Sequence, residues 1–221
     1  GADVRGGAAL FKNQAACPFR AFARHRLRAE ALEEADLGMD AMERGNLVHN
    51  VLQHLWQSLG TQEALRKLSE PERNAAVGDA VERTVTTAAA RRPQVLTARF
   101  AAVERARLCI LVQAWLDVES MRDPFTVTGC ETSRPFQLGG ISGHLRMDRV
   151  DTLADGRQVI IDYKTGKVPA KPWEGPRPEE PQLPLYAMGA VGEAGAAGVV
   201  ALAFAQVRAG EWPAGARKLL M

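Results

Sequence analysis

The sequence is poor in cysteine and has no long apolar run. Cys17, Cys109 and Cys130 are too few and too scattered among 221 residues for a disulfide framework or a zinc ribbon. No apolar stretch approaches the ~20 residues that a membrane-spanning helix needs, and there is no charged and then apolar secretory leader. We therefore expect a cytoplasmic protein without a membrane partner.

The net charge is also small, so the overall composition does not argue for a nucleic-acid partner. The 28 Lys and Arg residues and 26 Asp and Glu residues leave a net charge of +2. Basic residues nevertheless gather on one short helical stretch, where Arg20 and Arg24 are interleaved with Phe19 and Phe22. We expect both arginines to contact nucleic-acid phosphates while the Phe rings anchor the helix. A solvated basic face is the alternative.

The chain is long enough to bury one sizeable core. Its 221 residues are 46% hydrophobic, which predicts a single domain over residues 1–221. Helical periodicity dominates residues 1–122, whereas strand patterns appear within residues 123–221. Because the sequence begins with Gly1 rather than Met, we expect a piece excised from a longer protein.

Apolar periodicity and turn residues predict the individual elements. Helices are expected at residues 14–30, 42–59, 70–91 and 96–122, and again from Gln182. Strands are expected at residues 125–137, 141–152, 157–164 and 198–204. The Pro-rich segment 169–181 is longer than most connections, and we expect it to form a mobile flap over a groove.

Two carboxylates and a lysine gather around one predicted hairpin. Asp162 and Lys164 follow the apolar run 159–161, and Asp148 lies on the strand before the turn residues 154–156. If these three turn residues form the connection, Asp148 stands opposite Asp162, and side-chain alternation puts Lys164 on the same face. A shift of one residue would separate the three side chains, so the register of the hairpin is itself a prediction.

This set of side chains suits a hard divalent cation. Carboxylates supply oxygen ligands, and a lysine supplies a fixed positive charge for a phosphate or an attacking water. Close carboxylates also repel each other unless a cation neutralises them. We therefore expect Asp148 and Asp162 to hold Mg²⁺ or Mn²⁺. The alternative is an exposed strand whose alternating Asp and Lys residues only face solvent.

Five ordered motifs make most of the chain similar to a known family. The chain resembles the RecB-type nuclease domains of the PD-(D/E)XK superfamily, which form the nuclease halves of bacterial helicase–nuclease repair complexes. The motifs are Cys17-Pro18-Phe19-Arg20-Ala21-Phe22, Arg44-Gly45-Asn46-Leu47-Val48-His49, Gly143 with Asp148-Arg149 and Asp151, Asp162-Tyr163-Lys164-Thr165-Gly166, and Gln182-Leu183-Pro184-Leu185-Tyr186-Ala187.

The resemblance implies a fold and a set of residue roles. The implied fold is α/β and restriction-endonuclease-like: a central mixed sheet flanked by helices, with an N-terminal helical region and the catalytic core in residues 123–221. In such domains the residues matching Asp148 and Asp162 bind the metal and are catalytic. The residue matching Lys164 is the catalytic lysine, and the residue matching His49 is an additional metal ligand.

His49 lies on a helix whose buried face can be read from the sequence. Val48, Leu52 and Leu55 recur at helical spacing, and His49 borders the stripe that they form. A single helical His is more often a core or surface residue than a ligand. The resemblance favours the ligand, and a neutral imidazole would accept Mn²⁺ beside Mg²⁺.

Four further residues carry less specific signals. Gln182 and Tyr186 are four residues apart, so on a helix they share one face. A Tyr there is usually core, but the resemblance favours the wall of an active-site groove near DNA. Glu131 resembles an accessory acidic residue near the metal, with a solvated strand carboxylate as the alternative. Arg149 is interpreted either as a phosphate contact or as a structural ion-pair partner.

The resemblance implies a Mg²⁺- or Mn²⁺-dependent deoxyribonuclease with exonuclease action. We expect it to act on single-stranded DNA or duplex ends, in repair or recombination, together with a helicase subunit or domain. The alternative is a non-catalytic, nuclease-like DNA-binding scaffold of a helicase complex. Some relatives hold an iron–sulfur cluster with one Cys at the position of Cys17. Because no Cys follows Cys130, we expect no such cluster here.

Overall fold

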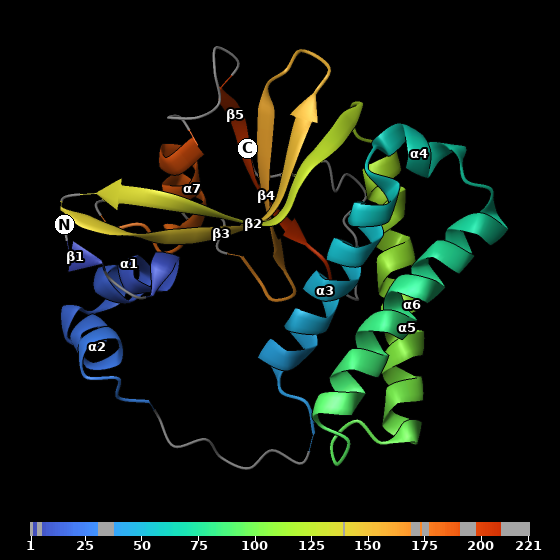
Figure 1. Cartoon of the computed structure of the whole chain (residues 1–221), viewed down its shortest axis with the longest axis horizontal. Helices are drawn as coiled ribbons and strands as arrows, with labels where there is room; N and C mark the ends of the chain where they lie inside the picture. Colours follow the sequence, from blue (N-terminus) through green and yellow to red (C-terminus); the bar gives the residue numbers. More distant parts are fainter. Residues whose placement is uncertain are drawn as a thin grey trace.

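The protein consists of a sheet beside a layer of long helices, with a shorter helical segment at the N-terminal end (Figure 1). The structure is a computed structural model, and it describes residues 2–3, 6–30, 38–138, 140–168, 173, 177–190 and 198–208. Most of the segment 169–181, for which a flap is predicted, lies outside the described residues.

The N-terminal helical region is broken rather than continuous. β1 (Ala2–Asp3) is followed by α1 (Gly7–Ala16), α2 (Pro18–Ala21) and the π-helix η1 (Phe22–Arg26). The prediction of one helix over residues 14–30 is wrong because Cys17 is extended, with φ −165° and ψ 115°. A residue before proline avoids the α region, so α1 ends before Pro18 and α2 begins at it.

The two Phe rings of this region face solvent. Phe19 is 74% exposed and Phe22 is 52% exposed, so the prediction that they anchor the helix is wrong. The buried residue of α2 is the small Ala21, which is 3% exposed. Arg20 and Arg24 are also exposed, and their contact with phosphates stays a prediction.

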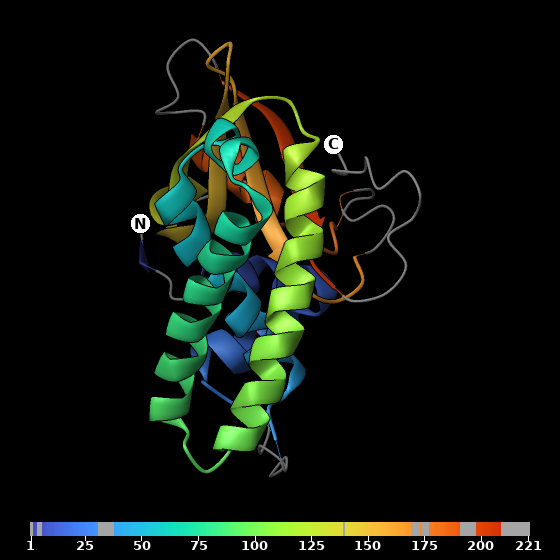
Figure 2. The ribbon, with the colours of Figure 1, turned by 90° about the vertical axis from the view of Figure 1, so that its right-hand side faces the viewer.

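Three long helices form the layer beside the sheet. They are α3 (Ala41–Leu59), α5 (Glu70–Arg91) and α6 (Ala98–Ser120), which confirms the helices predicted at 42–59, 70–91 and 96–122 to within two residues. Capping boxes begin α3 and α5. The short α4 (Gln62–Lys67) was not predicted, because six residues show little periodicity. Figure 2 shows α5 and α6 running side by side.

Within the described residues, the sheet has five strands in the order β1-β3-β4-β5, with β2 paired to β3. The strands β2 (Phe125–Leu138), β3 (Ile141–Leu153) and β4 (Gln158–Lys164) are antiparallel neighbours, and β5 (Val199–Gln206) runs parallel to β4. The helix α7 (Gln182–Ala190) lies between β4 and β5 in the chain. The predicted α/β fold, with a mixed sheet flanked by helices and an N-terminal helical region, is confirmed.

Both faces of β4 are buried. Ile161 and Tyr163 belong to the cluster that contains Trp56 of α3, whereas Ile160 belongs to a second cluster with Leu183 of α7. Successive strand residues point to opposite faces, so each layer of helices covers one set. Burial on both faces matches the continuous apolar run, and polar side chains gather where β4 ends.

The hairpin between β3 and β4 has the predicted register. Arg149 stands opposite Ile161, and the hydrogen bond from Leu153 N to Arg157 O at 2.8 Å closes a three-residue connection over residues 154–156. Continuing the ladder by one position brings Asp148 opposite Asp162. The predicted register of the hairpin is therefore confirmed.

No described helix combines the length and the apolar surface that crossing a bilayer requires.

Candidate active site

Asp148 and Asp162 meet at the end of the hairpin. Asp148 Oδ2 accepts a hydrogen bond from the backbone N–H of Tyr163 at 2.8 Å. Asp162 is 1% exposed, and burial, together with the charge of Asp148, raises its pKa to about 6. Its Oδ2 lies 2.7 Å from Lys164 Nζ but makes no hydrogen bond of acceptable geometry. The result is a buried acidic group whose charge is only partly compensated.

His49 reaches this pair from α3. Its Nδ1 lies 3.3 Å from Asp148 Oδ2, and its ring stands edge-on to Tyr163 with 5.8 Å between centroids. Burial lowers the pKa of His49, but the hydrogen bond and charge of Asp148 outweigh this and raise it above 6.5. Gly45 brings α3 this close, because a Cβ there would lie 3.2 Å from Thr165 Oγ1.

Glu131 joins the same cluster from β2. One ligand atom from each of His49, Glu131 and Asp148 lies within 4.8 Å of the others. Glu131 has a φ of 51°, near a register shift in β2, and its carboxylate pairs with Arg146 at 2.5 Å. Burial and the charge of Asp148 raise its pKa. A left-handed conformation is uncommon for a glutamate, and such outliers concentrate at functional sites.

Lys164 is held by a line of hydrogen bonds that begins on α7. Its Nζ donates to Gln182 Oε1 at 3.2 Å, and Gln182 Nε2 donates to the Tyr186 hydroxyl at 2.6 Å. That hydroxyl in turn donates to the backbone carbonyl of Arg146. Burial raises the pKa of Tyr186, which keeps the hydroxyl protonated as a donor. The structure thus brings Gln182 and Tyr186 next to the predicted catalytic lysine.

A groove of about 430 Å³ opens beside these residues. Asp148, Lys164, Gln182 and Tyr186 line it together with residues 6–9 and Lys12 of the α1 segment. The α1 wall was not foreseen from the sequence, because it depends on a contact between segments far apart in the chain. Its local signal is the pair of glycines, Gly6 and Gly7, where α1 begins: a Cβ on Gly7 would lie 3.0 Å from the His144 carbonyl oxygen.

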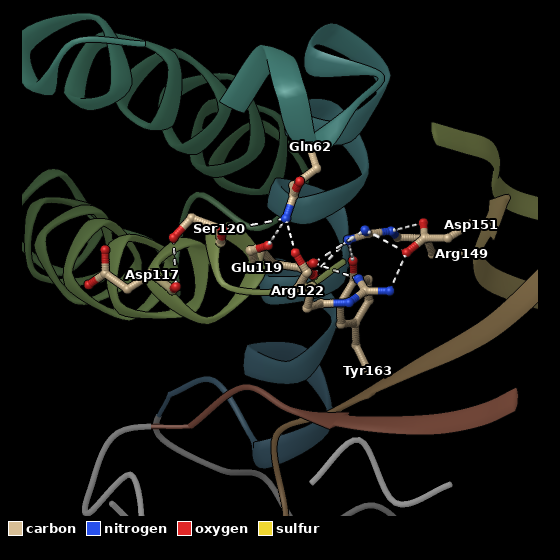
Figure 3. A network of polar contacts seen from close by, with 8 residues as sticks. All are labelled: Gln62, Asp117, Glu119, Ser120, Arg122, Arg149, Asp151 and Tyr163. Atoms are coloured by element: carbon tan, nitrogen blue, oxygen red, sulfur yellow. Dashed lines mark hydrogen bonds and ion pairs between the residues drawn. The ribbon is translucent and has the colours of Figure 1, made fainter. Parts of the chain in front are cut away.

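Arg149 does not face the groove. It is 0% exposed, and its guanidinium lies 2.7 Å from Glu119 and 2.6 Å from Asp151 (Figure 3). The interpretation of Arg149 as a DNA contact is therefore wrong, since a phosphate cannot reach a fully buried side chain. The alternative interpretation, a structural ion-pair partner, is the one that the structure supports.

Arg149 belongs to a buried network in which positive and negative charges balance. Arg122 pairs with Glu119 at 2.6 Å and with Asp151 at 2.8 Å, so two guanidiniums face two carboxylates. Burial raises the pKa of Glu119, but Arg149 and Arg122 outweigh it and hold the pKa below 4.5. Arg149 also donates to the Tyr163 hydroxyl at 3.1 Å and lies 4.0 Å from the centre of the Trp56 ring.

This buried network fixes the strands that carry the candidate metal ligands. Arg149 follows Asp148 in β3, and Tyr163 follows Asp162 in β4. Gln62 of α4 donates to the backbone of Glu119 and so ties the helical layer to the same point (Figure 3). The sequence did not reveal Glu119 or Arg122, because charged residues near the end of a helix usually face solvent.

The donor set fits a hard or borderline divalent cation. Carboxylate oxygens of Glu131 and Asp148 and the imidazole of His49 suit Mg²⁺ or Mn²⁺, and the charges of Asp148 and His49 act on the neighbouring Asp162. A cation there would relieve the repulsion that raises the pKa of Asp162. Arg20 and Arg24, by contrast, do not line the groove.

The part of the chain that matches a known protein family includes this whole site. The model of the PD-(D/E)XK nuclease superfamily matches residues 11–217, which include every predicted site residue from Arg20 to Tyr186. No curated protein matches the chain.

Proposed function

Because the chain belongs to the PD-(D/E)XK nuclease superfamily, we propose that it is a Mg²⁺- or Mn²⁺-dependent deoxyribonuclease. The observation that carries the proposal is the convergence of three potential ligands, His49, Glu131 and Asp148, next to Asp162, whose carboxylate pairs with the ammonium of Lys164. These residues come from α3, β2, β3 and β4, so the fold and not one motif assembles them.

Each group has a role that follows from its surroundings. Asp148, Asp162, Glu131 and His49 would hold the cation. A bound divalent cation lowers the pKa of a water and offsets charge on a phosphate. Lys164, oriented by Gln182, directs its ammonium at the same place, where it can orient the attacking water or stabilise a developing negative charge. Gln182 and Tyr186 form the wall that keeps Lys164 in position.

The finer parts of the proposal rest on the five RecB-type motifs. They support exonuclease action on single-stranded DNA or duplex ends, within cytoplasmic repair or recombination and beside a helicase subunit or domain.

A cleavage assay tests the proposal. End-labelled single- and double-stranded DNA and a circular single strand would be incubated with the protein in Mg²⁺, Mn²⁺ or EDTA. We expect linear DNA to be cut only with a divalent cation. The Lys164→Ala variant should lower the rate by about 10²-fold or more, because it removes a charge positioned for the transition state.

The control is Lys167→Ala, which removes an exposed lysine three residues further along and should leave cleavage unchanged. Cutting of the circular strand would contradict exonuclease action. DNA binding without cleavage under every condition would favour the non-catalytic scaffold instead.

A further inference from the structure

Exposed aromatic rings are concentrated on residues 18–28, which we call the N-terminal arm. Among the described Phe, Tyr and Trp residues, only Phe19 and Phe22 are exposed. They are three residues apart across α2 and η1, which places them on one side of the helical turn. Adjacent solvent-exposed aromatic rings are typical of a surface that binds a ligand or a partner.

The N-terminal arm also carries positive charge that no described ion pair neutralises. Its four arginines are all exposed, and none forms an ion pair with any residue that the structure describes: Arg20, Arg24, Arg26 and Arg28. Residues 6–29 contain no Asp or Glu, although the whole chain is nearly neutral at +2. A ligand of this surface must therefore tolerate aromatic contact and supply negative charge.

The backbone of the arm is unusual and well defined. Leu27 N donates to the Phe22 carbonyl at 3.1 Å, the i to i+5 pattern of a π-helix, and Ala29 N donates to Ala23 O at 2.9 Å. Arg28 ends this turn in the left-handed region with a φ of 56°. Short π-helical turns are rare and recur at functional sites.

The arm is attached next to the groove. His25 Nε2 lies 3.0 Å from Asn13 Nδ2 of α1, and its ring fills the space that a Cβ on Gly6 would need. Gly6 and Lys12 line the groove with the candidate catalytic residues. Figure 1 shows α1 between the β2–β3 ribbon and α2, so a strand that leaves the groove along α1 meets the arm.

We propose that the N-terminal arm binds single-stranded DNA, with bases stacked on Phe19 and Phe22 and phosphates contacted by its arginines. Alternating rings and cations match the two repeating features of a single strand, its base faces and its phosphates. In a duplex the base faces are covered by neighbouring base pairs, so the rings would have no partner. The proposal takes DNA as the ligand from the proposed function but requires no cleavage.

Binding assays can separate the arm from the groove. All measurements would use the 221-residue chain with Lys164→Ala in EDTA, so that the probe stays intact. Fluorescence anisotropy would compare a 20-nucleotide oligo(dT), a 4-nucleotide oligo(dT) and a 20-base-pair duplex. We expect Phe19→Ala with Phe22→Ala to weaken binding of the 20-mer about tenfold or more, since stacking is lost at two bases. The 4-mer and the duplex should lose less affinity, because the 4-mer offers few bases and the base faces of the duplex are covered.

The charged residues are tested through salt dependence. Arg20→Gln with Arg24→Gln should reduce the slope of log K against log salt by about 0.7 for each phosphate that the arginines no longer neutralise. Ile110→Ala on α6 is the control for the double Phe variant. Its apolar side chain is 73% exposed, like that of Phe19 at 74%, but lies away from the arm. Circular dichroism would check that each variant stays folded.

An unchanged affinity for the 20-mer in the double Phe variant would overturn the proposal, and so would an equal loss of affinity for the duplex. In the first case a protein partner would be the better occupant of the rings. Because these assays measure binding without metal, a failure of the proposed nuclease activity would not affect their outcome.

Discussion

Buried carboxylates on the two sides of the β3–β4 hairpin have pKa values that are shifted in opposite directions. On the side of the groove, burial and a neighbouring carboxylate raise the pKa of Asp162 to about 6. On the side of α6, two arginines hold the pKa of the equally buried Glu119 below 4.5. Burial alone therefore does not decide the state of a carboxylate. The candidate site lies where nearby positive charges do not balance the negative charge. The buried network around Arg149 lies where positive and negative charges balance.

This comparison indicates a division of labour within one hairpin. The side with balanced charges, around Arg149, stabilises the register of the strands. The side around Asp162 carries uncompensated negative charge, which lowers the stability of the fold but suits a cation. Proteins commonly trade stability for function in this way. Substitutions on the two sides should therefore change activity and stability in different combinations.

The largest effect is expected on the side of the groove. Asp162→Asn removes a candidate metal ligand and should lower the rate of cleavage by about 10³-fold or more. In EDTA the same variant should raise the free energy of unfolding by about 1–3 kcal/mol, because it replaces a buried charge whose pKa is raised. Urea unfolding and the cleavage assay measure the two changes.

The matched variant is Asp155→Asn, which neutralises an exposed carboxylate in the loop of the same hairpin. Activity and stability should both stay close to those of the unsubstituted chain. An Asp162→Asn variant that is less stable in EDTA would show that its charge is already compensated.

The next effect is expected in the buried network. Arg149→Met leaves two buried carboxylates with one arginine and should lower the free energy of unfolding by about 3–5 kcal/mol. The control is Arg157→Met, whose partner Asp155 is exposed, so its loss should hardly change stability. If both variants lose the same stability, the network does not support the hairpin as described.

The smallest effects concern pH and have opposite signs on the two sides. The folded pKa of Glu119 is below 4.5, so its contribution to stability is complete above that pH and is lost as the pH falls. The folded pKa of Asp162 is above 3.8, so stability without metal falls as the pH rises from about 4 to about 6.

Urea unfolding between pH 3 and 7 in EDTA would measure both slopes. Glu119→Gln should remove the loss on the acid side, and Asp162→Asn should remove the decline toward neutral pH. Identical pH profiles for the three chains would contradict the assignment of opposite shifts.

The hairpin could be predicted from the sequence because local rules determine it. Side chains alternate along a strand, and a short turn fixes the pairing, so the positions of Asp148, Asp162 and Lys164 follow from counting residues. The long helices were equally accessible, since their periodicity extends over many turns. Cys17 shows the limit of this approach, because the residue before Pro18 breaks a helix that the apolar pattern extends.

The surroundings of the hairpin could not be predicted in the same way. Whether Arg149 meets a phosphate or a carboxylate depends on Glu119, which arrives from another element. The place of Glu131 in the ligand cluster depends on a register shift and a positive φ, and the neighbouring residues in the sequence predict neither of them. These features are properties of tertiary structure, and each of them joins segments that are distant in the chain.

The three-residue connection between β3 and β4 has a consequence for how such a site can vary. The number of residues in this loop sets the pairing register of β3 and β4, and therefore which residue of β4 stands opposite Asp148. Adding one residue at 154–156 would turn the whole of β4 over, sending Tyr163 toward the groove and Asp162 toward the helices. Evolution can change any side chain along this loop, but it cannot freely change its length.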